Sequence, residues 1–438
     1  MANPIKSQEE ILQKLNIQIL NPMQEEAIPL IRKQENTLLL SPTGTGKTLA
    51  FSLPLLDMLN PESEEVQALI LVPSRELAIQ IEQVIRSMGS GYKVNAVYGG
   101  RPVSKDKLEI KHNPAILIGT PGRILDHFNR ERFSKTNIKT LILDEFDKSL
   151  EVGFEEDMKS ILGQLPNLEK RILTSATQGV KIPGFVGLGQ PSVVNYLDQK
   201  GNPKLSLKTV VSPSQNKLKT LVKLIQHVGN KQGIVFCNLR DSIQEVSDYL
   251  SHHEISHTCF FGTMEQKDRE QALIKFRNGS LQLLVATDLA ARGIDIPELQ
   301  FIIHYELPIH EEEFIHRNGR TARVNAKGTA YILKWEREAL PEFIEGAQKA
   351  DISSKTALKP SYWETLFISG GRRDKISKGD IAGLFFKQGK LNKDQLGRIE
   401  LKPDCAFVAV PSSLANDLVD KLNNSRLKTK KVRIQILE

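Results

Sequence analysis

The sequence has 438 residues, a net charge of +7, 40% hydrophobic residues and 25% charged residues. This length predicts two or three domains, and the composition is typical of a soluble globular protein. Its three cysteines (Cys237, Cys259 and Cys405) lie far apart without a CxxC or Cys/His pattern, which argues against a zinc site or a disulfide framework.

Two further features of the bulk sequence bear on location and partners. Residues 1–14 lack an apolar signal core, and no apolar run approaches membrane-spanning length, so we expect a cytoplasmic protein without a membrane partner. Residues 362–438 hold 15 Lys and Arg against 9 Asp and Glu, whereas the first 361 residues hold 44 against 43. A basic tail of this kind indicates nucleic-acid binding, with a solubilising surface as the alternative.

The first candidate in chain order is Gln24. Pro22 is placed to open a helix, which leaves Gln24 in the first helical turn. A glutamine amide carries both a donor and an acceptor and can therefore read the edge of adenine. Taken by itself, a solvated helix glutamine is the simpler interpretation.

Residues 41–48 (SPTGTGKT) follow the apolar run 37–40 and predict a phosphate-binding loop. The glycines allow backbone N–H groups to approach an anion, Lys47 neutralises its charge, and the Thr48 hydroxyl can ligate Mg²⁺. Ser41 stands where the strict pattern has glycine, which indicates a helicase-type variant of the loop. A strand–helix turn without a ligand is the alternative.

Four more short apolar runs follow, each ending in a polar motif. The runs are 68–72, 115–118, 140–143 and 171–173, and the motifs are 73–78, 119–123, 144–147 and 174–177. Continuous apolar runs predict a parallel sheet that is covered on both faces. Because ligands bind at the carboxyl ends of such strands, these motifs predict one site at that edge.

After a weakly patterned linker at 195–204, the rhythm returns in the runs 233–238, 281–287, 301–304 and 329–333. This predicts a second parallel-sheet domain, and no Gly-rich phosphate loop occurs in it. Arg320 and Arg323 are three residues apart and therefore share one helix face, which suits a triphosphate presented from the first domain.

The tail has the predicted order βαββαβ of an RNA-recognition sandwich. Its strands are 365–368, 397–401, 406–410 and 432–436, and its helices are 379–386 and 414–422. By the period of two, Val432, Ile434 and Ile436 face one way in the last strand.

In order and spacing, the motifs from Gln24 to Arg323 resemble the DEAD-box RNA helicase family, and the tail resembles the DbpA-type RNA-binding domain. The resemblance implies an α/β fold, with two tandem RecA-like parallel-sheet domains and a small α+β RRM-like domain. We place these domains at 1–200 and 205–345, followed by a connector at 346–361 and the RNA-binding domain at 362–438.

The resemblance also implies roles for individual residues, with ATP and Mg²⁺ as cofactors. The catalytic group comprises Lys47, Asp144, Glu145, His316, Arg320 and Arg323, in which Glu145 is the base and Asp144, with Thr48, holds Mg²⁺ partly through water. The ATP contacts are Gln24, Ser41, Thr43, Gly44, Thr45, Gly46, Lys47, Thr48 and Asp295. The residues that couple hydrolysis to RNA are Asp147, Ser175 and Thr177.

Implied RNA contacts lie in all three domains, and for any one Gly or Thr among them a turn role is the alternative. They are Arg75, Gly100, Thr120, Gly122, Arg123, Gln266, Arg269, Thr287 and Gly293, with Arg372, Arg373, Lys428, Lys430, Lys431 and Arg433 in the tail.

The implied function is ATP-dependent separation of short RNA duplexes by a monomer, directed to structured ribosomal RNA in large-subunit assembly. An ATP-gated RNA clamp and a DNA-directed motor are the alternatives. Phe146 departs from the family pattern, which has a small residue there, and a ring at this position requires repacking behind the Mg²⁺ site.

Overall fold

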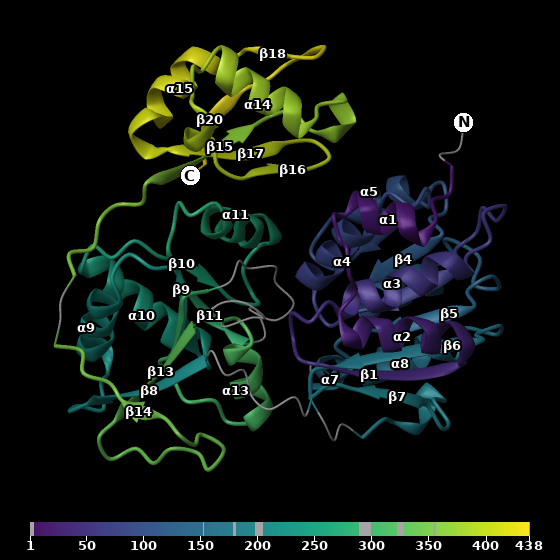
Figure 1. Cartoon of the computed structure of the whole chain (residues 1–438), viewed down its shortest axis with the longest axis horizontal. Coiled ribbons are helices and arrows are strands. Elements are labelled where there is room, and N and C mark those ends of the chain that lie inside the picture. Colours follow the sequence, from purple (N-terminus) through teal and green to yellow (C-terminus); the bar gives the residue numbers. More distant parts are fainter. Residues whose placement is uncertain are drawn as a thin grey trace. The chain divides into compact units, whose positions relative to one another are not determined.

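The computed structural model describes residues 4–151, 153–177, 181–197, 205–288, 299–321, 328–353 and 356–437. The chain folds as two compact units, the first formed mainly by residues up to 203 and the second by residues from 204 onward. Each unit contains a parallel sheet, and the second also contains a small antiparallel sheet (Figure 1).

The sheet of the first unit has seven parallel strands among the described residues, in the order β3-β4-β2-β5-β6-β1-β7. Alternate residues of the apolar strands enter two separate cores: Ile70 and Ile142 contribute to one, Leu69 and Leu141 to the other. Both faces are therefore buried, as the continuous apolar runs predict. The strands are β1 Asn36–Leu40, β2 Ala68–Leu71, β3 Val94–Val97, β4 Ile116–Gly119, β5 Thr140–Leu143, β6 Lys170–Ser175 and β7 Ser192–Asn195.

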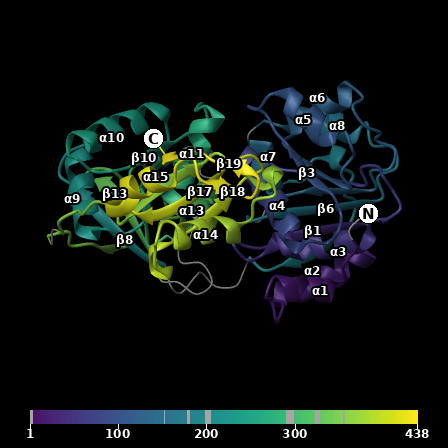
Figure 2. The ribbon, with the colours of Figure 1, turned by 90° about the horizontal axis from the view of Figure 1, so that it is seen from above.

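Helices cover both faces of this sheet. Figure 2 shows α1, α2 and α3 on one side and α5, α6 and α8 on the other. Ile11 of α1 and Met23 of α2 pack in one core, and Phe128 of α6 and Met158 of α8 pack in the other. The helices are α1 Gln8–Lys14, α2 Pro22–Lys33, α3 Lys47–Met58, α4 Arg75–Met88, α5 Val103–Ile110, α6 Pro121–Asn129, α7 Phe146–Glu151 and α8 Glu155–Leu162.

The described strands of the second unit form another seven-stranded parallel sheet, in the order β10-β11-β9-β12-β13-β8-β14. This order repeats that of the first sheet, with β8 in the place of β1 and β12 in the place of β5. The strands are β8 Leu205–Ser212, β9 Gly233–Cys237, β10 Thr258–Phe260, β11 Leu283–Thr287, β12 Phe301–His304, β13 Gly328–Trp335 and β14 Gln348–Lys349. The helices are α9 Leu218–Val228, α10 Arg240–His252, α11 Gln266–Arg277 and α13 Glu311–Asn318.

The tail forms an antiparallel sheet in the order β16-β17-β15-β20, with two helices on it. Val432 and Ile434 are buried in its core, as the period of two predicts. The elements are β15 Trp363–Ile368, α14 Lys378–Lys387, β16 Ile399–Leu401, β17 Ala406–Pro411, α15 Ala415–Leu422 and β20 Ile434–Ile436, with the hairpin β18 Arg426–Leu427 and β19 Lys430–Lys431.

The tail sheet packs against α11 within the second unit. Arg277 donates two hydrogen bonds to Glu400, each 2.6 Å long, and both side chains are largely buried. Ile274 of α11 joins Phe407 in a small apolar cluster, with Phe367 packed against it. One face of the tail sheet is therefore occupied by the protein itself.

The predicted fold class is confirmed: two parallel-sheet domains precede a small sheet of βαββαβ order. The sequence patterns missed β3, β7, β8, β10 and β14, together with the β18–β19 hairpin. Part of the predicted linker, residues 198–204, lies outside the described residues.

Candidate nucleotide site and RNA interface

The loop between β1 and α3 has the backbone of a phosphate-binding turn. Gly44 and Gly46 have φ values of 87° and 86°, in the left-handed region that favours glycine. Helix α3 begins at Lys47 without a side-chain cap at Gly46. The Lys47 ammonium is largely buried and donates to the carbonyl oxygen of Pro42 at 3.2 Å. The loop therefore joins a helix N-terminus that has no side-chain cap to one buried cation, the two features that favour an anion.

Gln24 fastens the start of α2 to this loop. Its side-chain Nε2 donates to the Gly46 carbonyl at 3.2 Å, and its Oε1 accepts from the Asn21 backbone N–H at 3.0 Å. Asn21 in turn donates to the Thr45 carbonyl at 2.8 Å. A Cβ added at Gly46 would lie 2.4 Å from the Gln24 amide, so the two positions fit closely. The structure thus places Gln24 beside the loop, with both amide atoms already in contact with protein.

The acidic motif lies at the end of β5, two strands from β1 in the sheet. Asp144 is 3% exposed, and Glu145 has a left-handed φ of 49°. Burial raises the pKa of the Asp144 carboxyl, while a hydrogen bond from Thr174 and the charge of Lys47 oppose this shift. The buried carboxylate therefore lies within the electrostatic influence of the loop lysine.

The predicted coupling residues are in contact. The Thr177 hydroxyl donates to Asp147 at 2.9 Å, and the Thr177 backbone N–H donates to the Ser175 hydroxyl at 3.0 Å. Phe146 is 1% exposed and packs in the apolar core, so its ring leaves this contact intact. The repacking expected at Phe146 is accommodated in the core and not in the site.

The oxygen atoms at this edge of the first sheet are suitable ligands for Mg²⁺. This ion prefers oxygen ligands, keeps several waters, and is commonly bound by one or two carboxylates together with substrate phosphates. The Asp144 carboxylate and the Thr48 hydroxyl at the start of α3 supply such oxygens. No group of three or more His, Cys, Asp or Glu side chains placed to hold a metal occurs in the described part of the chain.

The predicted RNA contacts of the first unit form two local groups. A Cβ at Gly100 would lie 2.3 Å from the Arg75 guanidinium, so this glycine (φ 82°) allows the loop to approach Arg75. Arg123 donates to Asp106 at 2.6 Å and to the Arg101 carbonyl at 2.8 Å. Asp106 is fully buried, and its role in holding Arg123 has no signature in the sequence. Thr120 and Gly122 lie at the start of α6, beside Arg123.

In the second unit, Arg269 is 6% exposed and its guanidinium lies 4.7 Å from the Phe260 ring centroid. Gln266 begins α11, and Thr287 ends β11. His316 lies on α13, and Arg320 follows this helix; both are buried. The predicted residues Gly293, Asp295 and Arg323 lie outside the described residues.

Sequence reasoning missed Arg317, which organises this edge of the second sheet. It is 1% exposed and donates to Asp288 at 2.7 Å, to the Glu306 carbonyl at 2.7 Å and to the Asn238 side chain at 2.7 Å. These partners follow β11, β12 and β9, so one buried arginine ties three strand ends together. Arg317 lies three residues before Arg320 in the sequence, and this spacing does not indicate that Arg317 holds the strand ends.

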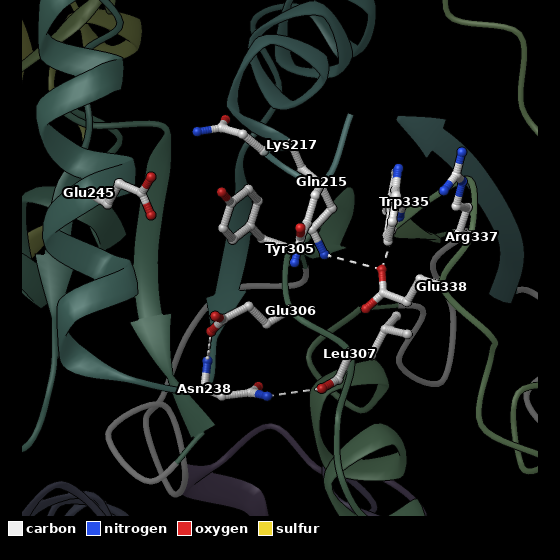
Figure 3. Close-up of a pocket in the computed structure, with 11 residues that line it drawn as sticks. Gln215, Lys217, Asn238, Glu245, Tyr305, Glu306, Leu307, Trp335, Arg337 and Glu338 are labelled. Carbon is white, nitrogen blue, oxygen red and sulfur yellow. Dashed lines mark hydrogen bonds and ion pairs between the residues drawn. The ribbon is translucent and has the colours of Figure 1, made fainter. Parts of the chain in front are cut away.

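A pocket of about 600 Å³ lies at the carboxyl ends of β8, β9, β12 and β13 (Figure 3). Its position in the sheet corresponds to that of the phosphate loop in the first unit, and Lys217, the residue before α9, lines it. No glycine lines it, and it contains three carboxylates, Glu245, Glu306 and Glu338. They outnumber the two cations of the pocket, Lys217 and Arg337, so the pocket lacks the net positive charge that would attract a phosphate group.

The basic residues predicted in the tail come together around the β18–β19 hairpin. Lys430 pairs with Asp374 at 2.8 Å, which joins the hairpin to the turn carrying Arg372 and Arg373. Lys428 pairs with Asp380 at 3.0 Å, and Lys431 and Arg433 are exposed. By contrast, the ring of Phe407 on the tail sheet is 7% exposed because it packs on α11.

None of the helices in the described ranges combines the length and apolar character that crossing a membrane requires. Three family models match the chain: a DEAD/DEAH box helicase model at residues 21–182, a helicase conserved C-terminal domain at 216–325 and a DbpA RNA binding domain at 365–436.

Among curated proteins, the chain is 31% identical to the ATP-dependent RNA helicase DbpA of Escherichia coli, over 98% of this chain and 96% of that protein. It is 33% identical to the DEAD-box ATP-dependent RNA helicase RhpA of Helicobacter pylori, over 83% of this chain and 74% of that protein. Among solved structures, S. cerevisiae Dbp5 bound to RNA and ADP BeF3 matches with a TM-score of 0.70 and 25% identity, over 79% of this chain and 94% of that chain.

Proposed function

Because the chain belongs to the DEAD-box family of ATP-dependent RNA helicases, and is thus an RNA-dependent ATPase, we propose that it separates short RNA duplexes and is directed by its tail to structured RNA of the large ribosomal subunit. The observation that carries this proposal is the grouping of Lys47, Asp144 and the Thr177–Asp147 contact at the strand ends of one sheet. We place the helicase domains at 1–200 and 205–345, the connector at 346–361 and the RNA-binding domain at 362–438.

Phosphoryl transfer depends on positioning and charge stabilisation. We assign Glu145 to orient and deprotonate the attacking water, and Lys47 to support the β- and γ-phosphates. Asp144 and Thr48 would hold Mg²⁺, which neutralises charge on the phosphates when bound. Arg320, together with Arg323, would stabilise charge that develops in the transition state, so hydrolysis would require the two helicase domains to close. Gln24 would select adenine.

The link to RNA is assigned to the contact between Thr177 and Asp147, because these side chains join two strand ends at the nucleotide site. Arg75, Gly100, Arg123 and their neighbours would hold the RNA backbone, which is blind to base sequence. Backbone contacts of this kind suit an enzyme that acts on many duplexes. Target choice then falls to the tail.

Support for the tail as the targeting element comes from its basic residues, which gather at one hairpin while its sheet face packs on α11. A monomer working in the cytoplasm, in ribosome assembly, is part of the same proposal. The three free cysteines suit such a reducing compartment.

The tail assignment predicts that the double substitution Lys431→Ala/Arg433→Ala weakens binding to large-subunit ribosomal RNA hairpins by about tenfold and lowers the salt slope of binding by about 1.5. The double substitution Lys219→Ala/Lys223→Ala on α9 is the matched control, since both lysines are exposed. Binding is measured by fluorescence anisotropy across a salt series. Equal hairpin affinity for both variants would refute the tail assignment.

Point substitutions test the proposed role of the tail in RNA binding better than removal of residues 362–438 does. Deleting the tail would uncover Ile274 and leave Arg277 without its carboxylate partner, so any loss of RNA binding could follow from damage to the second unit. ATPase activity with short unstructured RNA should remain unchanged in the double variant, because the substituted side chains lie in the tail.

A further inference from the structure

One hydroxyl group contacts both acidic residues of the proposed catalytic pair. Thr174 donates a hydrogen bond to Asp144 Oδ1 and accepts one from the backbone N–H of Glu145 at 3.2 Å. Thr174 lies on β6, the strand between β5 and β1, and is fully buried. The hydroxyl is thus engaged both as a donor and as an acceptor, and both partners belong to the acidic motif.

The hydroxyl is not needed to fill space at this position. Valine has nearly the same shape and is a favoured residue of buried strands. A buried hydroxyl carries a desolvation cost unless it is hydrogen-bonded, so its two partners account for its presence. The sequence gives no separate sign of this, because Thr174 opens the polar motif 174–177 and no spacing connects it to Asp144.

Both partners of the Thr174 hydroxyl, the Asp144 carboxylate and the Glu145 backbone, depend on a hydrogen bond for their orientation. A carboxylate rotates about its terminal bond over a broad range unless its oxygens are hydrogen-bonded. Glu145 has a left-handed φ of 49°, which is uncommon for a residue with a side chain, and its N–H would lose its acceptor without Thr174. One hydroxyl therefore fixes the direction of the Asp144 oxygens and the backbone from which the Glu145 side chain departs.

We propose that Thr174 is a positioning residue that orients Asp144 toward Mg²⁺ and thereby sets the magnesium dependence of nucleotide binding. The inference rests on the proposed role of Asp144 as the metal-binding carboxylate. Thr174 itself does not contact the reacting atoms. Its contribution is expected only where Mg²⁺ is present.

The test compares Thr174→Val, which removes the hydroxyl at nearly constant volume, with Thr174→Ser, which keeps it. Thr37→Val is the matched control, because Thr37 lies on the neighbouring strand β1, is fully buried, and its hydroxyl has no hydrogen-bond partner among the described residues. The affinity for a fluorescent ADP analogue is measured in the full chain with saturating Mg²⁺, across a Mg²⁺ titration and with EDTA. Thermal unfolding is recorded for each variant.

For Thr174→Val we expect the half-saturating Mg²⁺ concentration to rise about tenfold, in line with loss of a hydrogen bond to a charged group. The affinity in EDTA should change by less than about twofold, because without the metal the orientation of Asp144 no longer matters to the nucleotide. Thr174→Ser and Thr37→Val should keep the wild-type Mg²⁺ dependence.

A Thr174→Val protein whose Mg²⁺ dependence equals that of the wild type would overturn the inference, as would an equal loss of affinity in EDTA. Either result would reduce the hydroxyl to a structural role. If Thr174→Val does not fold, Thr174→Ala carries the test under the same criteria. Wild-type protein that binds nucleotide without any effect of Mg²⁺ would instead refute the proposed metal site, and this inference with it.

Discussion

Replacement of Glu145 by glutamine lowers ATP turnover by about 10²–10⁴-fold, while ATP and RNA remain bound. Glutamine keeps the shape and the hydrogen-bond acceptor of the side chain but cannot take a proton from the attacking water. The backbone N–H of residue 145 still reaches Thr174, so the local structure is preserved. Phosphate release at saturating RNA and ATP measures turnover, and fluorescence anisotropy measures retention of the two ligands.

Glu156→Gln serves as the control for Glu145→Gln. Glu156 lies in the first turn of α8 and is exposed, so the same chemical change there removes no proposed function. Its turnover should match that of the wild type. Hydrolysis by the Glu145→Gln protein at the control rate would show that another group acts as the base.

The second large effect is expected at Arg320, whose substitution by alanine should lower turnover by about 10³–10⁵-fold, the range of arginine fingers. Its backbone is fixed on both sides: its N–H donates to the Arg317 carbonyl at 3.1 Å, and its carbonyl accepts from Leu299 at 3.3 Å. Truncation of the side chain leaves these backbone contacts in place. The measured quantities are the single-turnover hydrolysis rate and the affinity for ATP, of which mainly the rate should fall.

Arg320→Lys separates charge from geometry, because lysine keeps the charge without the planar fork of the guanidinium. We expect the hydrolysis rate of Arg320→Lys to lie nearer to that of Arg320→Ala than to that of the wild type. Arg337→Ala is the control on the same unit, since Arg337 is exposed, lines the pocket of Figure 3 and has no role in the proposed mechanism. A wild-type hydrolysis rate in Arg320→Ala would remove this residue from the mechanism.

The sequence predicted the central strands of both sheets because they are continuous apolar runs. It missed β3, β10 and β14, which lie at sheet edges, and β7, a short edge strand. Strand β8, which follows the predicted linker, was also missed, because it mixes exposed and buried residues and has no continuous apolar run. Strands β7, β10 and β14 leave most of their residues partly or fully exposed, so their sequences are less constrained toward apolar residues. Strand β3 is buried, but it has only four residues and Asn95 interrupts its apolar run.

The proposed nucleotide site was predictable because its residues follow strands whose carboxyl ends meet at one edge. The contact between Thr177 and Asp147 is one result of this arrangement. Supporting residues were not predictable, since they depend on side-chain packing between elements. Asp106 beside Arg123 and Thr174 beside Asp144 belong to different helices and strands, with no spacing that connects them.

The packing of the tail sheet on α11 could not be predicted from the sequence either. The alternation in β15 and β17 shows which residues share a face, but not that Phe407 packs on Ile274 or that Glu400 pairs with Arg277. Both contacts are formed by residues far apart in the chain. Similarly, the sequence predicted that the Phe146 ring requires repacking behind the Mg²⁺ site, but not which residues accommodate it; the ring lies in the apolar core.

The most direct test of the proposed function is release of a labelled strand from a short RNA duplex joined to a large-subunit ribosomal RNA hairpin. We expect repeated strand release with ATP, little release with a non-hydrolysable analogue, and little from the matched DNA duplex, which lacks 2′-hydroxyl groups. ATP hydrolysis without strand release from the RNA duplex would contradict the proposal and identify an ATP-gated clamp instead.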